Sequence, residues 1–107
     1  MIIVTTTDIQ SSEIKNTLGM VRGSSIRSRH IGQDIMAVLR NITGGEVTEY
    51  TKMLAEAREQ ALDRMIEEAQ TLEADAVICV RFQTSMVMAG AAEMLAYGTA
   101  VTLEPTS

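Results

Sequence analysis

The sequence predicts a single α+β domain over residues 1–107, because one long helical pattern is accompanied by segments with the alternation of β-strands. Between Val47 and Leu72, apolar residues recur every three or four positions, which places them on one face of an amphipathic helix. These residues are Val47, Tyr50, Leu54, Ala57, Ala61, Met65, Ala69 and Leu72. Residues 76–87 and 94–103 predict two strands. We therefore expect the helix to pack on a small sheet.

Two further strands are expected before the long helix. Residues 2–7 are rich in β-branched side chains, which favour the pleated, half-buried setting of a strand. A second strand is expected near Leu18–Arg22. Within and after it, Gly19 and Gly23 indicate a bend, a bulge or the close approach of another backbone.

A short helix is predicted over residues 31–42, because the apolar spacing there changes to that of about three helical turns. Ser28 is a candidate N-cap, and the run Thr43-Gly44-Gly45 stops the helix since glycine readily adopts a left-handed conformation. The end of the long helix lacks such a glycine. If Glu73 takes a positive φ there, the strain is on the order of 1 kcal/mol.

The two C-terminal strands each predict two different faces. In residues 76–87, one face carries Ile78, Val80, Phe82 and Met86, and the other carries Cys79, Arg81, Gln83 and Ser85. In residues 94–103, one face carries Leu95, Tyr97, Val101 and Leu103, and the other carries Ala96, Gly98 and Ala100. Because this last face is small, we expect a bulky group or another backbone to pack against it. A turn is expected at residues 89–91, and Pro105 ends the pairing because it lacks an amide hydrogen.

The composition predicts a thin hydrophobic core. Apolar residues make up 46% of the chain, yet tryptophan is absent and the aromatic residues are Tyr50, Phe82 and Tyr97. Small domains often compensate for a thin core with disulfides, metals or oligomerisation. The single cysteine excludes a disulfide within the chain. Self-association is therefore expected, with a second copy of the chain as the partner.

Charge and hydropathy exclude other partners. The net charge of −5 leaves no surplus of positive charge for binding phosphates, so we expect no nucleic acid partner. No apolar run reaches the roughly 20 residues that span a bilayer, and the N-terminus lacks the features of a signal peptide. The expected location is the cytoplasm, with which the unpaired Cys79 agrees.

Candidate metal ligands are few. Cys79 and His30 are the only residues of their kinds, so a zinc site of clustered cysteine and histidine cannot form within one chain. Copies of either residue could meet only across subunits. Met86, Met88 and Met94 carry thioethers suited to Cu(I), although methionine also fills cores that are poor in aromatic residues, and we favour this second role.

No enzyme class is indicated. The double glycine is not followed by the Lys-Ser or Lys-Thr of a phosphate-binding loop, and no G-x-S-x-G motif is present. Carboxylate pairs such as Glu67-Glu68 fall on the solvated side of the long helix, where nothing would raise their pKa for acid–base work. We therefore expect a protein that is not an enzyme.

An ordered set of residues resembles the YbjQ family over nearly the whole chain. The set comprises Ile3-Val4-Thr5-Thr6-Thr7, Val21-Arg22-Gly23, Asp34, Arg40, Gly44-Gly45, Tyr50, Leu54, Ala57-Arg58, Ala61, Ala69, Leu72, Ala74-Asp75-Ala76-Val77 and Gly98-Thr99-Ala100-Val101. The resemblance implies a β-α-β-β unit like the dodecin subunit, with a mostly antiparallel sheet, assembled as a pentameric ring. It also implies heavy-metal binding, which was assigned to this uncharacterised family from structural comparison.

The chain departs from the family where a metal site would need oxygen ligands. Relatives tend to have a glycine and then alternating acidic residues after Val77, whereas this chain has Cys79, Arg81 and Gln83. An arginine repels a cation, which argues against a carboxylate site on that face. The expected function is a small oligomeric binding or scaffold module. The alternative is binding of a soft heavy-metal ion across subunit interfaces through Cys79, His30 or methionines, with that ion as the one cofactor considered.

Overall fold

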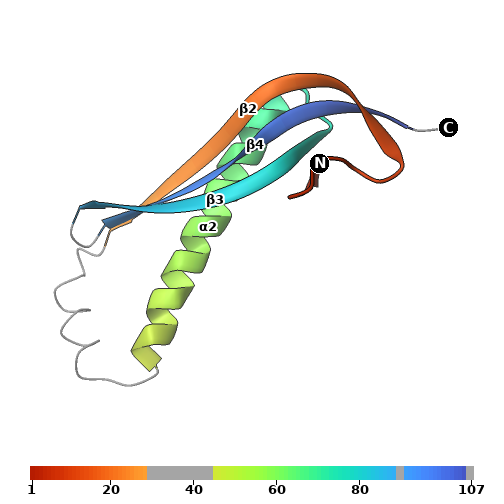
Figure 1. The fold of residues 1–107 in the computed structure, drawn as a ribbon. Coiled ribbons are helices and arrows are strands. Elements are labelled where there is room, and N and C mark those ends of the chain that lie inside the picture. The colour runs from red at the N-terminus through yellow and green to blue at the C-terminus, as the bar shows by residue number, and fades with distance from the viewer. Residues whose placement is uncertain (29–44, 89–90, 106–107) are drawn as a thin grey trace.

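One long helix packs on a four-stranded sheet in the computed structural model, which describes residues 1–28, 45–88 and 91–105 (Figure 1). The strands are β1 (Ile2–Ile3), β2 (Ser12–Ser28), β3 (Ala76–Met88) and β4 (Ala91–Pro105), and the helix is α2 (Gly45–Thr71). The α+β class is thereby confirmed. The short helix expected over residues 31–42, and residues 89 and 90 of the expected turn, lie outside the described residues.

The strands lie in the order β1-β3-β4-β2. β4 pairs antiparallel with both β2 and β3, and β1 pairs parallel with β3. The sheet is therefore mixed, with mostly antiparallel neighbours as predicted. No described helix is both long enough and apolar enough to cross a membrane.

β2 is much longer than the predicted segment Leu18–Arg22. It spans 17 residues and pairs with β4 from Ser12 to Ser28. Its polar residues are accommodated because the partner strand satisfies the backbone hydrogen bonds along this length. Ser28, predicted as a helix N-cap, is the last residue of the strand, and the helix that it would cap lies outside the described residues. Gly19 has a φ of 124° beside a register shift, so the bulge expected at a glycine is confirmed.

Gly23 is the point at which the helix backbone approaches the sheet. A Cβ atom added there would collide with backbone atoms of Ala61, Arg64 and Met65 in α2. The close backbone approach expected at a glycine in this region is therefore confirmed. Because α2 packs mainly on β2 and β4, it lies toward one side of the sheet.

The central apolar face of α2 forms the main core, as predicted. Ala57, Ala61, Met65 and Ala69 are buried together with residues of β2, β3 and β4. The prediction was wrong for Leu72, which is 42% exposed because the helix ends at Thr71. Glu73 follows with a φ of 59°, which confirms the positive φ considered for it. The side chains of Val47 and Tyr50 lie outside the described part of the structure.

In β4, the residues on each face are those predicted from the sequence, whereas in β3 they differ from the prediction. Ala96 and Ala100 are buried toward the helix, while Val101 and Leu103 pack on the opposite side of the sheet. Gly98 lies against β3, where an added Cβ would come within 2.7 Å of the Val77 Cγ1 atom. In β3, however, Val80 joins the helix-side cluster and Ile78 joins the cluster on the opposite side. The prediction that these two residues share a face was wrong, because a bulge interrupts the alternation.

Candidate functional site

The bulge in β3 is centred on Cys79, one of the two predicted metal ligands. Ile78 pairs with Thr99 and Arg81 pairs with Tyr97, so two residues of β3 lie opposite Gly98. Cys79 takes a φ of 56°, a left-handed conformation that is rare for residues with a Cβ atom. The extra residue moves Val80 to the helix side and leaves Arg81 and Gln83 on the opposite face.

The N-terminal segment holds this bulge in place. The Cys79 amide donates to the Thr6 carbonyl at 3.0 Å, and the Val80 amide donates to the Val4 carbonyl at 3.1 Å. The Val4 amide in turn donates to the Val77 carbonyl at 3.0 Å. The regular part of the first strand, Ile2–Ile3, is thus shorter than predicted. Backbone hydrogen bonds between this segment and β3 nevertheless continue to Thr6.

The surroundings of the Cys79 side chain are mainly apolar. The thiol is free and the residue is half-buried, packed against the cluster of Ala76, Ile78 and Val101. Arg81 Nη1 donates to the Thr5 carbonyl at 3.0 Å and to the Val80 carbonyl at 2.8 Å. The guanidinium therefore fastens the N-terminal segment and places positive charge close to Cys79. A cation would be repelled at this point.

The described residues of one chain do not form a metal site. No group of three or more His, Cys, Asp or Glu residues within the described ranges could hold an ion. His30 lies outside those ranges, so the structure does not place the second predicted ligand. The donor set that the described residues offer at Cys79, a single thiol in apolar surroundings beside an arginine, does not by itself fit a heavy-metal ion.

The methionines have different environments. Met94 is 7% exposed, and its Sδ atom accepts a hydrogen bond from Thr84 Oγ1 at 3.2 Å, which agrees with a core-filling role. Met86 is 69% exposed, so the expectation that it fills the core was wrong. The Met88 side chain lies outside the described residues. Thioethers of Met86 and Met94 therefore face different surroundings.

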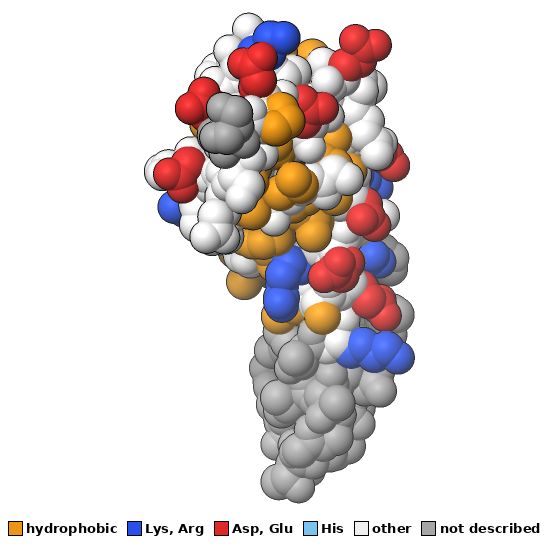
Figure 2. All heavy atoms as spheres, turned by 90° about the vertical axis from the view of Figure 1, so that its right-hand side faces the viewer, with side chains coloured by type: hydrophobic (Ala, Val, Ile, Leu, Met, Phe, Trp, Pro, Cys, Tyr) orange, Lys and Arg blue, Asp and Glu red, His pale blue; other side chains and the backbone are white. Residues whose placement is uncertain are grey.

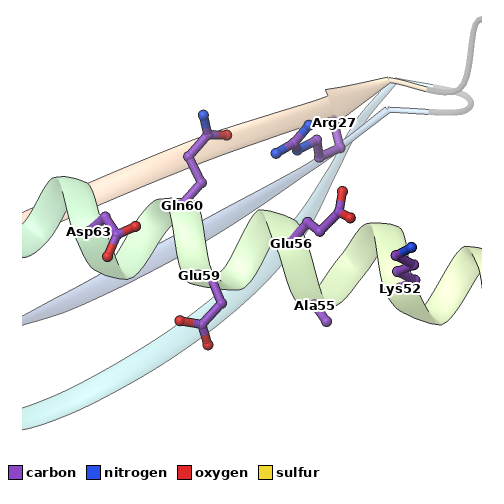
Figure 3. Close-up of a pocket in the computed structure, with 7 residues that line it drawn as sticks. All are labelled: Arg27, Lys52, Ala55, Glu56, Glu59, Gln60 and Asp63. Carbon is purple, nitrogen blue, oxygen red and sulfur yellow. The ribbon is translucent and has the colours of Figure 1, made fainter.

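A cleft of about 500 Å³ lies between α2 and the end of β2 (Figure 3). It is lined by Arg27, Lys52, Ala55, Glu56, Glu59, Gln60 and Asp63. Figure 3 shows Arg27 on the strand above the helix, with Glu56 and Gln60 extending toward the strand. Beside the cleft, the Ser25 hydroxyl donates to Gln60 Oε1 at 2.6 Å.

Arg27 brings a buried polar atom to this cleft. Its Nε atom is buried and has no hydrogen-bond partner among the described residues. Sequence reasoning missed the cleft, because its walls come from positions about 30 residues apart whose juxtaposition depends on how α2 crosses β2. The signal in the sequence is the run of acidic residues on one side of the helix, which the helical period alone predicts to be exposed to solvent.

Comparisons with known proteins identify the family. Residues 1–104 match the family model described as "Putative heavy-metal-binding". A UPF0145 protein of Methanosarcina acetivorans is 64% identical over 101 residues, covering 94% of this chain and 95% of the relative. A UPF0145 protein of Thermosipho africanus is 51% identical over 107 residues, covering 100% of this chain and 99% of the relative.

A solved structure supports the fold. A crystal structure of a protein of unknown function from Pediococcus pentosaceus, assigned to the DUF74 family, superposes with a TM-score of 0.69. The superposition covers 97% of this chain and 98% of that chain, at 19% sequence identity. At this identity the likeness concerns the fold alone. The match over residues 1–104 and the close relatives lead to one conclusion: the chain belongs to the uncharacterised YbjQ family, also named UPF0145.

Proposed function

We propose that this protein is a non-catalytic binding or scaffold module that works as a homo-oligomeric ring, with the pentamer of dodecin-like units implied by the family resemblance as the expected assembly. The observation that carries the proposal is an apolar strip on β3 that the described part of the chain leaves exposed. The strip consists of Phe82 and Met86, which are 43% and 69% exposed. We call it the β3 strip.

The β3 strip lies on the side of the sheet that the helix covers elsewhere. Phe82 pairs with Ala96, and Thr84 pairs with Met94, and both β4 residues belong to the buried core. Directly opposed residues share a face, so Phe82, Thr84 and Met86 continue the helix-side face of β3. Val80, on the same face, is 4% exposed. The helix-side face of β3 is therefore covered as far as Val80 and exposed from Phe82 onward.

Burial of the β3 strip would offset the thin core. Fully burying one large apolar side chain contributes about 1.5–3 kcal/mol. The strands also extend far beyond an ordinary small sheet, since β2, β3 and β4 have 17, 13 and 15 residues against a usual 5 or 6. The radius of gyration is 17.6 Å, whereas a compact chain of this length has about 13 Å. On the side of the molecule seen in Figure 2, which is the right-hand side of Figure 1, hydrophobic side chains also gather and are bordered by charged groups.

Light scattering coupled to size-exclusion chromatography tests the proposal. We expect a mass of several times 11.6 kDa at micromolar concentration, and five times for the pentamer. The substitution Phe82→Ser should shift the mass toward one chain. Leu72→Ser is the matched control, because Leu72 is 42% exposed at the end of α2 and lies outside the β3 strip. A wild-type mass of 11.6 kDa would contradict the proposal.

A second candidate function is binding of a soft heavy-metal ion across the subunits of such an oligomer. It is supported by the description of the matching family and by the free, half-buried thiol of Cys79. In this proposal, copies of Cys79, together with His30 or methionine thioethers, supply the sulfur and nitrogen ligands that Cu(I) and related ions prefer.

Metal loading of the assembled protein tests this candidate. The protein is incubated with Cu(I), Zn(II) or Cd(II), desalted, and analysed by elemental mass spectrometry. We expect bound metal in the wild type and its loss in Cys79→Ser, with Met86→Leu lowering Cu(I) only. Equal metal content in the wild type and in a Cys79→Ser/His30→Ala variant would exclude binding through these ligands.

A further inference from the structure

We infer that the cleft between α2 and the end of β2 binds a small zwitterion of the amino-acid class, whose carboxylate is held by Arg27 and whose ammonium group is held by Glu56. Such a site goes beyond the proposed function, which names no ligand for the cleft, and it requires neither a ring nor a metal ion. Three features of the described residues support it: a buried donor that lacks an acceptor, charges of both signs, and enough room.

The alternation of β2 places Arg27 on the face of the strand that meets α2. Ser25, two residues earlier and therefore on the same face, donates a hydrogen bond to Gln60 Oε1 at 2.6 Å. Glu56 precedes Gln60 by about one turn of the helix. Figure 3 shows Arg27 on the strand, with Glu56 and Gln60 extending toward this strand from the helix. Pairing of Arg27 with Ala92 in β4 fixes its backbone at the wall of the cleft.

The buried donor is the Nε–H group of Arg27. Its Nε atom is buried and has no hydrogen-bond partner among the described residues. Most buried polar atoms of side chains are hydrogen-bonded, because an unmet donor loses its hydration without compensation. A carboxylate is the matching acceptor, since its two oxygens can accept from Nε and from a neighbouring Nη atom at once. The unmet donor therefore indicates a bound carboxylate.

The acidic residues of the cleft define the other half of the ligand. Glu56, Glu59 and Asp63 line the cleft together with the cations Arg27 and Lys52. Glu56 extends toward the strand, yet it does not accept a hydrogen bond from Arg27 Nε. A simple anion bound at Arg27 would be repelled by these carboxylates, whereas a molecule that also carries an ammonium group would be attracted by them.

The size and lining of the cleft suit a small hydrophilic molecule. Its volume of about 500 Å³ lies within the range of roughly 300–1,000 Å³ that is typical of small-molecule sites. Ala55 is the one apolar residue among the described residues that line the cleft, so an apolar ligand would gain little there. A zwitterion has no net charge and is therefore not repelled by a chain whose net charge is −5.

Nuclear magnetic resonance of the Arg27 Nε–H group in isotope-labelled protein tests the inference. The amino acids glycine, β-alanine and γ-aminobutyrate are each compared with the acid that lacks the amino group, namely acetate, propionate and butyrate. We expect at least one amino acid to shift the signal saturably and to bind more tightly than its matched acid. By calorimetry, Arg27→Lys should weaken this binding about 10- to 100-fold, the effect of losing a hydrogen bond between charged groups. Arg22→Lys is the matched control and should bind normally, because Arg22 is exposed on the opposite face of the same strand.

Glu56→Gln tests the ammonium half of the site. It should remove most of the preference for the amino acid over its matched acid, while the affinity for the acid stays the same or rises. Retained binding of the acid shows that the site is still folded in this variant. Glu59→Gln is the control and should keep the preference, because Figure 3 shows Glu59 directed away from the strand that carries Arg27.

The outcomes separate the zwitterion site from the proposed oligomer. Equal binding of the amino acids and their matched acids would overturn the inference, and so would unchanged binding in Arg27→Lys. The absence of any shift of the Arg27 signal at the highest soluble concentration of each compound would also overturn it. A wild-type mass of one chain with binding intact would contradict the oligomer alone, and an oligomeric mass without binding would contradict the zwitterion site alone.

Discussion

The β2 side and the β3 side of the sheet are covered unequally by the same helix. On the β2 side, the backbone of α2 lies against Gly23, and Arg64 donates a hydrogen bond to the Ser24 carbonyl. On the β3 side, Phe82 and Met86 remain exposed on the face that the helix would cover. One amphipathic helix is too narrow to cover strands of this number and length. The difference teaches that one amphipathic helix can complete the core on one half of a sheet and leave apolar side chains exposed on the other half.

The difference between the β2 side and the β3 side can be tested most strongly by replacing one methionine on each side with alanine. Met65 is 0% exposed and Met86 is 69% exposed. We expect Met65→Ala to lower the free energy of unfolding by about 2–5 kcal/mol, because it leaves a cavity in the core. Met86→Ala should leave the stability of the monomer nearly unchanged and weaken association instead. Urea denaturation at several protein concentrations measures both effects, and a large concentration-independent loss in Met86→Ala would break the comparison.

The close contact on the β2 side predicts the next largest effect. Gly23→Ala introduces a Cβ that collides with the α2 backbone, so we expect a loss of about 1–3 kcal/mol, typical of overpacking. Gly19→Ala is the control, since an added Cβ there has no atom within 4 Å and only the φ of 124° opposes it. In thermal and urea denaturation, the Gly23→Ala variant should be less stable than the Gly19→Ala variant. The reverse order would argue against close packing of α2 on β2.

Two residues at positive φ predict gains rather than losses. Glu73→Gly should raise the free energy of unfolding by about 1 kcal/mol, because glycine adopts the φ of 59° without a steric penalty. Cys79→Gly removes the same penalty at 56° but also loses the contacts of a half-buried side chain, so its gain should be smaller. Cys79→Ser, which keeps a Cβ, should show no gain. Equal stability of the three variants and the wild type would indicate that these positions are not strained.

Local sequence patterns were sufficient to predict parts of the fold. The spacing of Ala57, Ala61 and Met65 predicted the buried face of α2 because a helix repeats every 3.6 residues whatever surrounds it. The missing glycine predicted the conformation of Glu73. The bulge at Cys79 was missed, because a bulge depends on the N-terminal segment that accepts the freed amides. The cleft at Arg27 was missed because its walls come from β2 and α2, which lie side by side only in the folded chain.

The sequence by itself determined the α+β class, the long helix, the small face of β4 and the absence of a recognisable catalytic motif. These features depend on the period of apolar residues and on residue chemistry, both of which are local. Tertiary structure alone decided the length of β2, the separation of Ile78 from Val80 and the exposure of Phe82 and Met86. Pairing with β4 and the lateral position of α2 set these features. Gly23 connects the sequence with the tertiary structure. Because it has no side chain, the backbone of α2 can lie against β2, and the helix therefore covers that half of the sheet.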